Sequence, residues 1–121
     1  MTTRLLALAA ALAATALIVG SIGSAMSVPK LVGTTGPGFD IEVTKGGKDV
    51  KTLKPGKYSL TVKDKASIHN FHIKGPGLDK VVTSVSFVGT KTITITLKKG
   101  KYVYQCDPHA ASGMRGSFTV K

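Results

Sequence analysis

The chain has few of the residues that small proteins use for covalent stabilisation. Its 121 residues include one cysteine, three histidines and no tryptophan. A single cysteine cannot form an internal disulfide, so a small domain of this composition needs another source of stability. A bound metal is one candidate, because the free energy of metal binding adds to that of folding.

Acidic side chains are also scarce. Six Asp and Glu residues face 17 Lys and Arg residues, which gives a net charge of +11. The lysines are scattered over predicted turns and over the polar positions of predicted strands, as at Lys45, Lys48, Lys54 and Lys57. This scatter favours a solvated surface in which lysines protect strand edges. The alternative is attraction to an acidic partner protein or to an anionic cell envelope. Basic motifs interleaved with aromatic residues are absent, which argues against a nucleic-acid partner.

No charge interrupts the sequence from Leu5 to Ile22, and small residues follow up to Ala25. An apolar run that follows a positive charge and precedes small residues is typical of a secretory signal peptide. We therefore expect residues 1–25 to be a signal peptide, which predicts a secreted protein in the periplasm or cell envelope. The alternative is an uncleaved membrane anchor, because the run is nearly long enough to span a bilayer.

The remaining residues have the length of one small domain. Residues 26–38 are rich in Gly and Pro and predict an irregular lead-in. From residue 39 to 121, short segments of alternating apolar and polar side chains are separated by Gly and Pro turns, and no helical period is present. Thr92–Leu97 alternates most cleanly, whereas 81–88 fits either a strand or a covering loop. Seven or so short strands at this spacing predict an all-β sandwich.

One short segment carries three side chains that bind metals. Cys106, His109 and Met114 follow directly after an alternating segment that contains Tyr102 and Tyr104. The period of two places both tyrosines and Cys106 on one face, which we expect to point into the sandwich. One thiolate, two imidazoles and a weak thioether form the ligand set of an electron-transfer copper centre. Structural zinc, by contrast, normally does not recruit methionine.

Two histidines in a predicted strand over 68–73 compete for the remaining imidazole position. His69 and His72 are an odd number of residues apart, so on a regular strand they face opposite sides, and only one is expected near Cys106. We favour His69, because Asn70 beside it is placed to hydrogen-bond across to the cysteine loop. His72 is then expected to be a surface histidine or a hydrogen-bonded structural one.

The spacing Cys106-x2-His109-x4-Met114, with His69-Asn70 upstream, resembles the copper loop of plastocyanin and of the wider cupredoxin group. The resemblance covers about residues 39–121. It implies a Greek-key β-sandwich, a cupredoxin-like domain with one type 1 copper per chain, and one-electron transport. The copper ligands implied by position are His69, Cys106, His109 and Met114. A second upstream histidine and a basic surface depart from the plant plastocyanin pattern, so a plant-type docking partner is not implied.

These features together predict a mononuclear copper protein that carries electrons and is not an enzyme. The alternative is a protein that stores or delivers copper, and a third class is a sandwich in which the metal only stabilises the fold. Three histidines are too few for the trinuclear cluster of a multicopper oxidase, and a binuclear copper site would need a second cysteine.

The expected partner is a redox protein, for which the basic surface favours an acidic character, and the expected oligomeric state is a monomer. Contact with a membrane is expected only if the N-terminal segment is not cleaved. In the cupredoxin arrangement electrons would pass through the imidazole edge of His109. We expect the apolar docking surface around it to contain Leu78, Ala110, Ala111 and Met114.

Overall fold

A computed structural model of the protein describes residues 27–121. The predicted signal peptide, residues 1–25, lies outside these described residues. Ten strands and one short 3₁₀ helix form the domain, with the following bounds: β1 Lys30–Thr35, β2 Ile41–Lys45, β3 Lys48–Asp49, β4 Thr52–Leu53, β5 Gly56–Asp64, β6 Phe71–Gly75, β7 Leu78–Thr83, β8 Gly89–Leu97, β9 Gly100–Gln105, η1 Asp107–Ser112 and β10 Arg115–Val120. Within residues 27–121, no helix is long and apolar enough to cross a membrane.

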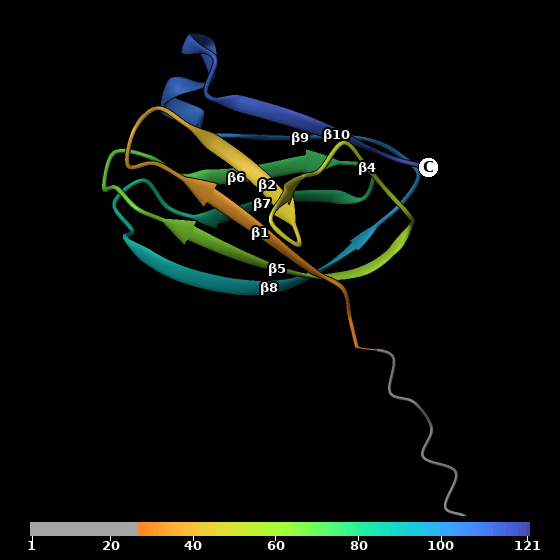
Figure 1. Ribbon diagram of the computed structural model, residues 1–121. Coiled ribbons are helices and arrows are strands. Elements are labelled where there is room, and N and C mark those ends of the chain that lie inside the picture. The colour runs from red at the N-terminus through yellow and green to blue at the C-terminus, as the bar shows by residue number, and fades with distance from the viewer. Residues whose placement is uncertain (1–26) are drawn as a thin grey trace, which may run out of the picture.

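The strands form two five-stranded sheets that face each other (Figure 1). One sheet has the order β3-β2-β1-β5-β8 and the other has the order β4-β10-β9-β6-β7. The chain changes sheet five times, at β3–β4, β4–β5, β5–β6, β7–β8 and β8–β9, so many strands that follow one another in sequence lie in different layers. The predicted all-β Greek-key sandwich is confirmed.

The alternating pattern of the strands accounts for the core between the sheets. In β5 every second side chain is buried, including Leu60 and Val62, and in β9 the buried side chains are Tyr102 and Tyr104. The Tyr102 ring stacks on Phe118 of β10 at a centroid distance of 5.4 Å. Cys106 continues the inward phase of β9 and is fully buried, as its position in the sequence predicts.

Strand registers define two ends of the sandwich. β1 and β5 run parallel and finish at Thr35 and Asp64, and β9 finishes immediately before Cys106. We refer to this end as the Cys106 end. β5 begins at Gly56, which lies opposite Leu97, and β9 begins at Gly100, which lies opposite Val120. These strand starts mark the opposite end.

The predicted irregular lead-in, residues 26–38, is wrong for Lys30–Thr35, because these six residues form β1 in the middle of a sheet. Gly33 lies in this strand, and a β-carbon there would stand 2.8 Å from the Phe71 ring. Glycine is therefore required here because the backbone of β1 passes close to an aromatic core residue. It does not mark a turn. Residues 27–29 before this strand are irregular, and residues 36–40 after it form an irregular loop at the Cys106 end.

Two other expectations are corrected in part. The predicted strand over 68–73 begins only at Phe71, so His69 and Asn70 precede it. Of the ambiguous segment 81–88, residues up to Thr83 belong to β7 and the remainder connects β7 to β8. The pairing of β6 with β7 shifts register between Phe71 and His72, so a simple period of two does not relate the two histidines.

Candidate metal centre

The segment between β9 and β10 is a compact loop closed by backbone hydrogen bonds. The N–H of Cys106 donates to the carbonyl of Met114 (3.0 Å), and the N–H of Met114 donates to the carbonyl of His109 (3.1 Å). Pro108 lies in the first turn of η1, where its missing N–H costs nothing. Gly113 ends the helix with a φ of +94°, a conformation that glycine adopts without strain. The loop thus holds three predicted ligands at fixed positions.

Three potential ligand atoms converge at the Cys106 end. The Nδ1 atoms of His69 and His109 are 3.1 Å apart, and Sγ of Cys106 lies 3.7 Å and 3.4 Å from them. A point equidistant from these atoms is about 2.0 Å from each, close to the roughly 2.0–2.3 Å bonds of imidazole nitrogen and thiolate sulfur to a late first-row metal. Within residues 27–121, this is the one cluster of His, Cys, Asp or Glu ligand atoms that could hold an ion.

The chemistry of these atoms fits a metal cation. Sγ of Cys106 and the two Nδ1 atoms are all metal donors, and a cation at their centre would be bound by all three at once. Cys106 and His69 are both fully buried, so water cannot take that role for them. Nε2 of His69 has no hydrogen-bond partner, so Nδ1 is the ring nitrogen of His69 that contacts other polar atoms. Soft thiolate and imidazole donors together suit copper.

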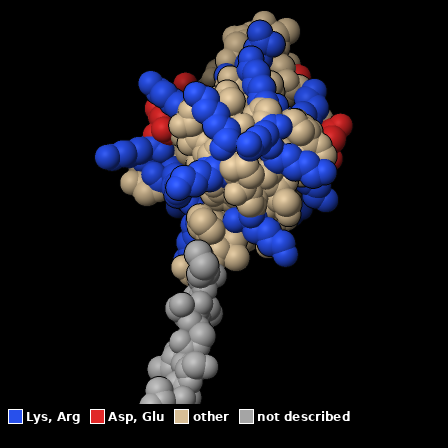
Figure 2. Space-filling model, turned by 90° about the vertical axis from the view of Figure 1, so that its right-hand side faces the viewer, with Lys and Arg blue, Asp and Glu red and all other residues tan. Residues whose placement is uncertain are grey.

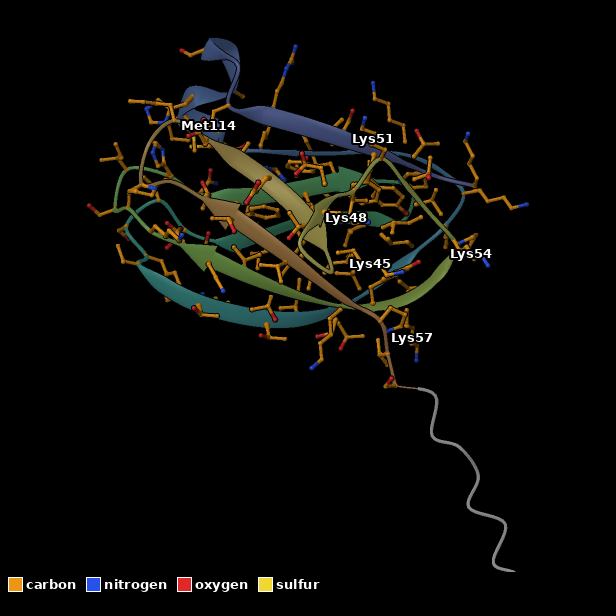
Figure 3. The ribbon with its side chains drawn as sticks, in the orientation of Figure 1. Lys45, Lys48, Lys51, Lys54, Lys57 and Met114 are labelled. Atoms are coloured by element: carbon orange, nitrogen blue, oxygen red, sulfur yellow. The ribbon has the colours of Figure 1, made fainter. Side chains whose placement is uncertain are left out.

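Met114 lies beside this cluster. Its side chain is 2 % exposed, and its backbone is hydrogen-bonded to both Cys106 and His109. Figure 3 shows Met114 at the same end of the sandwich as η1. All four predicted ligands, His69, Cys106, His109 and Met114, therefore come together at one end of the domain.

An aromatic side chain that the sequence did not single out also lies at the centre. The ring of Phe39 contacts the edges of both imidazoles, with centroids 5.3 Å from His69 and 4.9 Å from His109. Phe39 is 64 % exposed. It lies in the loop before β2, which begins at Ile41. The signal that the sequence offered for a loop residue is its position directly after Gly-Pro-Gly.

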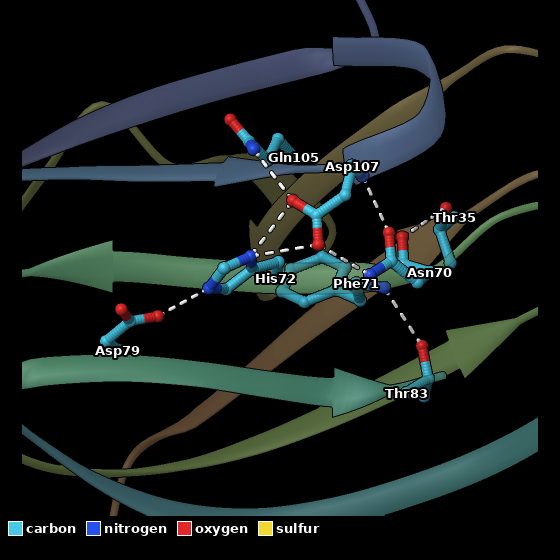
Figure 4. Close-up of polar contacts among 8 residues, drawn as sticks. All are labelled: Thr35, Asn70, Phe71, His72, Asp79, Thr83, Gln105 and Asp107. Carbon is cyan, nitrogen blue, oxygen red and sulfur yellow. Dashed lines mark hydrogen bonds and ion pairs between the residues drawn. The ribbon is translucent and has the colours of Figure 1, made fainter. Parts of the chain in front are cut away.

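Asn70 connects the histidine segment to the cysteine loop, as predicted. Its Nδ2 donates to Oδ2 of Asp107 (2.9 Å), and its Oδ1 accepts from the backbone N–H of Asp107 (2.7 Å). Asp107 directly follows Cys106, so both bonds fix the position of the sulfur. The hydroxyl of Thr35 donates to the Asn70 carbonyl and ties this unit to β1 (Figure 4).

His72 belongs to the outer side of the same network and not to the metal cluster. Its Nδ1 lies 2.9 Å from Asp107, and its Nε2 contacts Asp79 (Figure 4). Burial lowers the pKa of His72, but hydrogen bonds and charge from Asp79 and Asp107 outweigh it, so the net pKa is raised above 6.5. With a carboxylate at each ring nitrogen, both contacts are satisfied by the imidazolium form. The expectation of a hydrogen-bonded structural histidine is met.

Asp107 receives three side-chain hydrogen bonds, and the sequence gave no signal for its role. Burial alone would raise the pKa of its carboxyl, but hydrogen bonds from Gln105, Asn70 and His72 together with the charge of His72 lower it to about 2. Asp107 is therefore ionised at neutral pH and joins strand β9, the His69-Asn70 segment and β6. The sequence does not indicate this role, because Asn70 and His72 come close to Asp107 only in the folded chain.

One residue expected in the docking surface is wrongly placed. Leu78 starts β7 opposite Gly75, the last residue of β6, whereas β6 begins next to Asn70 at the Cys106 end. Leu78 therefore lies at the far end of that strand pair, where it packs against the core. Ala110 and Ala111 do lie on η1 beside His109. Phe39 and Ile68, which are 64 % and 50 % exposed, supply the larger apolar side chains next to the histidines.

Comparison with known proteins identifies the family. Residues 41–121 match the family model of copper-binding proteins of the plastocyanin/azurin family. Rusticyanin from Thiobacillus ferrooxidans is 31% identical, with a TM-score of 0.54 and coverage of 76% of both chains. Reduced rusticyanin is 30% identical, with a TM-score of 0.54 and coverage of 76% of this chain and 78% of that one. Another rusticyanin structure has a TM-score of 0.57 at 28% identity, covering 76% of each chain.

No curated protein sequence matches the chain significantly. The family model nevertheless covers about two thirds of the 121 residues and includes Cys106, His109 and Met114 as well as His69. The predicted cofactor, one type 1 copper, is confirmed by this match together with the His-Cys-His cluster. The chain belongs to the plastocyanin/azurin family of copper-binding proteins.

Proposed function

We propose that His69, Cys106, His109 and Met114 hold the copper and that the protein is a one-electron carrier in the extracytoplasmic space. The observation that carries this proposal is the convergence of Sγ of Cys106 with two imidazole Nδ1 atoms, all between 3.1 and 3.7 Å apart. Bound copper supplies a one-electron couple. The N-terminal segment, which has the pattern of a secretory signal, supports the location.

The surrounding residues favour fast electron transfer because they prevent rearrangement. Asn70 and Asp107 lock the backbone next to the sulfur, and the Cys106–Met114 backbone bond closes the loop. Two imidazoles, a thiolate and a thioether form a ligand set intermediate between those that Cu(I) and Cu(II) prefer. If the ligands are held in this arrangement, they move little when the charge of the ion changes. In this protein hydrogen bonds hold them, and no disulfide does.

His109 is the route by which electrons leave the site. It is the more accessible imidazole, since it is partly buried whereas His69 has no exposed surface. Exposed Phe39 and Ile68 flank the two histidines, and Ala110 and Ala111 continue the apolar surface on η1. A redox partner protein docks on this surface, where it excludes water and approaches the imidazole edge closely.

The experiment is an absorption titration of the protein with Cu(II), repeated with Cys106→Ser. An intense thiolate-to-copper charge-transfer band is expected in the wild type and absent in the variant, because serine supplies no thiolate. Reduction must bleach this band and reoxidation must restore it in the presence of a Cu(I) chelator. A band that does not return, with copper transferred to the chelator, contradicts electron transport and supports copper delivery. A weak spectrum in the wild type contradicts the ligand assignment.

A further inference from the structure

A groove lined by lysines lies on the part of the domain remote from the copper site. Six lysine side chains surround it, and its apolar floor includes Val50, Leu53 and Tyr58. The lysines are Lys45, Lys48, Lys51, Lys54, Lys57 and Lys121. Five of them fall within residues 45–57, on β2, β3, the connections that follow β3 and the start of β5, and the fold adds Lys121 from the end of β10.

The groove has a strong positive charge that the domain does not neutralise. All six lysines are exposed, and within residues 27–121 every ion pair involves His72 and none involves a lysine. Asp49 is the one carboxylate side chain among the lining residues. Figure 2 shows this side of the molecule, where Lys and Arg atoms spread across the face and Asp and Glu atoms appear only toward its edges. Such a surface attracts an anionic partner.

The groove lies too far from Cys106 to serve as the docking site for electron transfer. β5 runs from Gly56, beside the groove, to Asp64 at the Cys106 end. Nine strand residues at about 3.3 Å each give a length of roughly 30 Å. Figure 3 shows Met114 near one end and the five labelled lysines toward the other. Electron tunnelling falls steeply with distance, so a redox partner seated on the lysines would be badly placed.

The described chain also begins at this groove. Pro29 is one of its lining residues, and the carbonyl of Pro29 accepts a hydrogen bond from the N–H of Ser59, near the start of β5. The residues that precede Pro29 in the sequence therefore join the domain beside the lysines. Clustered lysines attract a protein to an anionic bilayer with or without an apolar segment before them.

The lining residues suit a lipid surface better than a protein surface. They include no arginine, no tryptophan and no exposed aromatic side chain, whereas protein interfaces concentrate their binding energy in such anchors. Lysine provides a mobile point charge on a long stem, which adapts to lipid headgroups that have no fixed positions.

We propose that this lysine groove docks the domain on an anionic lipid membrane, so that the Cys106 end faces away from the bilayer. The docked orientation leaves Phe39, Ile68 and His109 open to a partner while the opposite end holds the protein at the surface. This inference rests on charge and position and not on the ligand assignment, so its test requires no copper chemistry.

The test measures partition of the full chain onto vesicles by sedimentation at low salt. Two compositions are compared, phosphatidylcholine alone and phosphatidylcholine with one third phosphatidylglycerol. The ratio of the two partition coefficients isolates the electrostatic contribution, because the apolar segment 5–22 contributes to both. The groove variant carries Lys48→Gln, Lys51→Gln and Lys54→Gln. The matched control carries Lys63→Gln, Lys74→Gln and Lys80→Gln, which removes the same charge from exposed positions outside the groove.

One lysine near an anionic bilayer changes partition about fivefold, so the groove variant is expected to lower the ratio about 100-fold. The control is expected to lower it less than tenfold, and 0.5 M salt should abolish the preference for the anionic vesicles. Equal losses in both variants would show attraction by net charge alone and overturn the proposal. A ratio near one for the wild type would overturn it too. If poly-glutamate binds the groove while anionic vesicles do not, the occupant is an acidic protein and the proposal is wrong.

Discussion

The Asn70–Asp107 pair offers the sharpest test of how the fold supports the copper loop. Asn70→Ala removes the donor to Oδ2 of Asp107 and the acceptor of the Asp107 backbone N–H. A hydrogen bond to a charged group contributes about 1.5–3 kcal/mol and a neutral one about 0.5–1.5 kcal/mol. The Asp107 side chain is 40% exposed, so water replaces part of the loss. We expect a decrease of about 2 kcal/mol in the free energy of unfolding.

Urea unfolding of the copper-free protein measures this decrease. For a small domain the slope is about 1–3 kcal/mol per molar urea, so the midpoint should fall by about 1 M. Gln105→Ala is the matched control, because Gln105 donates a single hydrogen bond to the same carboxylate (2.8 Å). Its loss should cost less than about 1 kcal/mol. Copper affinity of the Asn70 variant should fall about 10- to 100-fold, as for other residues that hold a ligand in place.

The reasoning fails if Asn70→Ala is no more destabilising than Gln105→Ala. It also fails if the variant is destabilised as expected but binds copper with unchanged affinity. That second result would mean that the pair stabilises the sandwich without fixing the sulfur of Cys106.

Three further predictions follow from the same structure. The His72 pKa is raised above 6.5 in the folded state, so its stabilising contribution is complete below pH 6.5 and is lost as the pH rises through the folded pKa. His72→Gln should therefore flatten this part of the curve of unfolding free energy against pH for the copper-free protein. An unchanged curve would contradict the assignment. Gly75→Ala places a methyl group against the buried ring of Tyr102 and should cost about 1–3 kcal/mol in thermal or urea unfolding, whereas Gly38→Ala, with only one atom within contact range, should cost less than about 0.5 kcal/mol. Ala111→Glu adds a charge to exposed apolar surface near His109 and should slow electron transfer to the redox partner while leaving the copper absorption band unchanged; an unchanged rate would place docking elsewhere.

The sequence predicted those parts of the fold that depend on local pattern. Alternation in β8 and β9 placed Ile95, Leu97, Tyr102 and Tyr104 in the core, and the same period placed Cys106 inward. The spacing of the cysteine loop predicted three potential ligands, because one short segment carries all of them. The choice of His69 over His72 required a contact across the chain, which the His-Asn pair supplied.

What the sequence missed depends on contacts between distant segments. Gly33 looked like a turn residue, although the reason for a glycine there is the Phe71 ring that packs against it. Leu78 looked available for docking, but the pairing of β6 with β7 carries it away from Cys106. The role of Asp107 was invisible, since its partners Asn70 and His72 lie more than 30 residues earlier. A local pattern cannot report interactions that only the folded topology creates.

Hydrogen bonds between polar residues link segments at the Cys106 end that no disulfide links. Without a disulfide, the domain still has to join its two sheets at the Cys106 end, where three ligand atoms meet. His69 and Asn70 come from the segment before β6, Cys106 and Asp107 follow β9, and Thr35 ends β1 in the other sheet. The Thr35–Asn70 and Asn70–Asp107 hydrogen bonds connect all three segments. A metal bound by Cys106 and His69 adds a second connection between two of these segments, the one before β6 and the one after β9, so copper binding and folding stability must be coupled. Copper should therefore raise the unfolding temperature of the wild type by more than it raises that of Asn70→Ala.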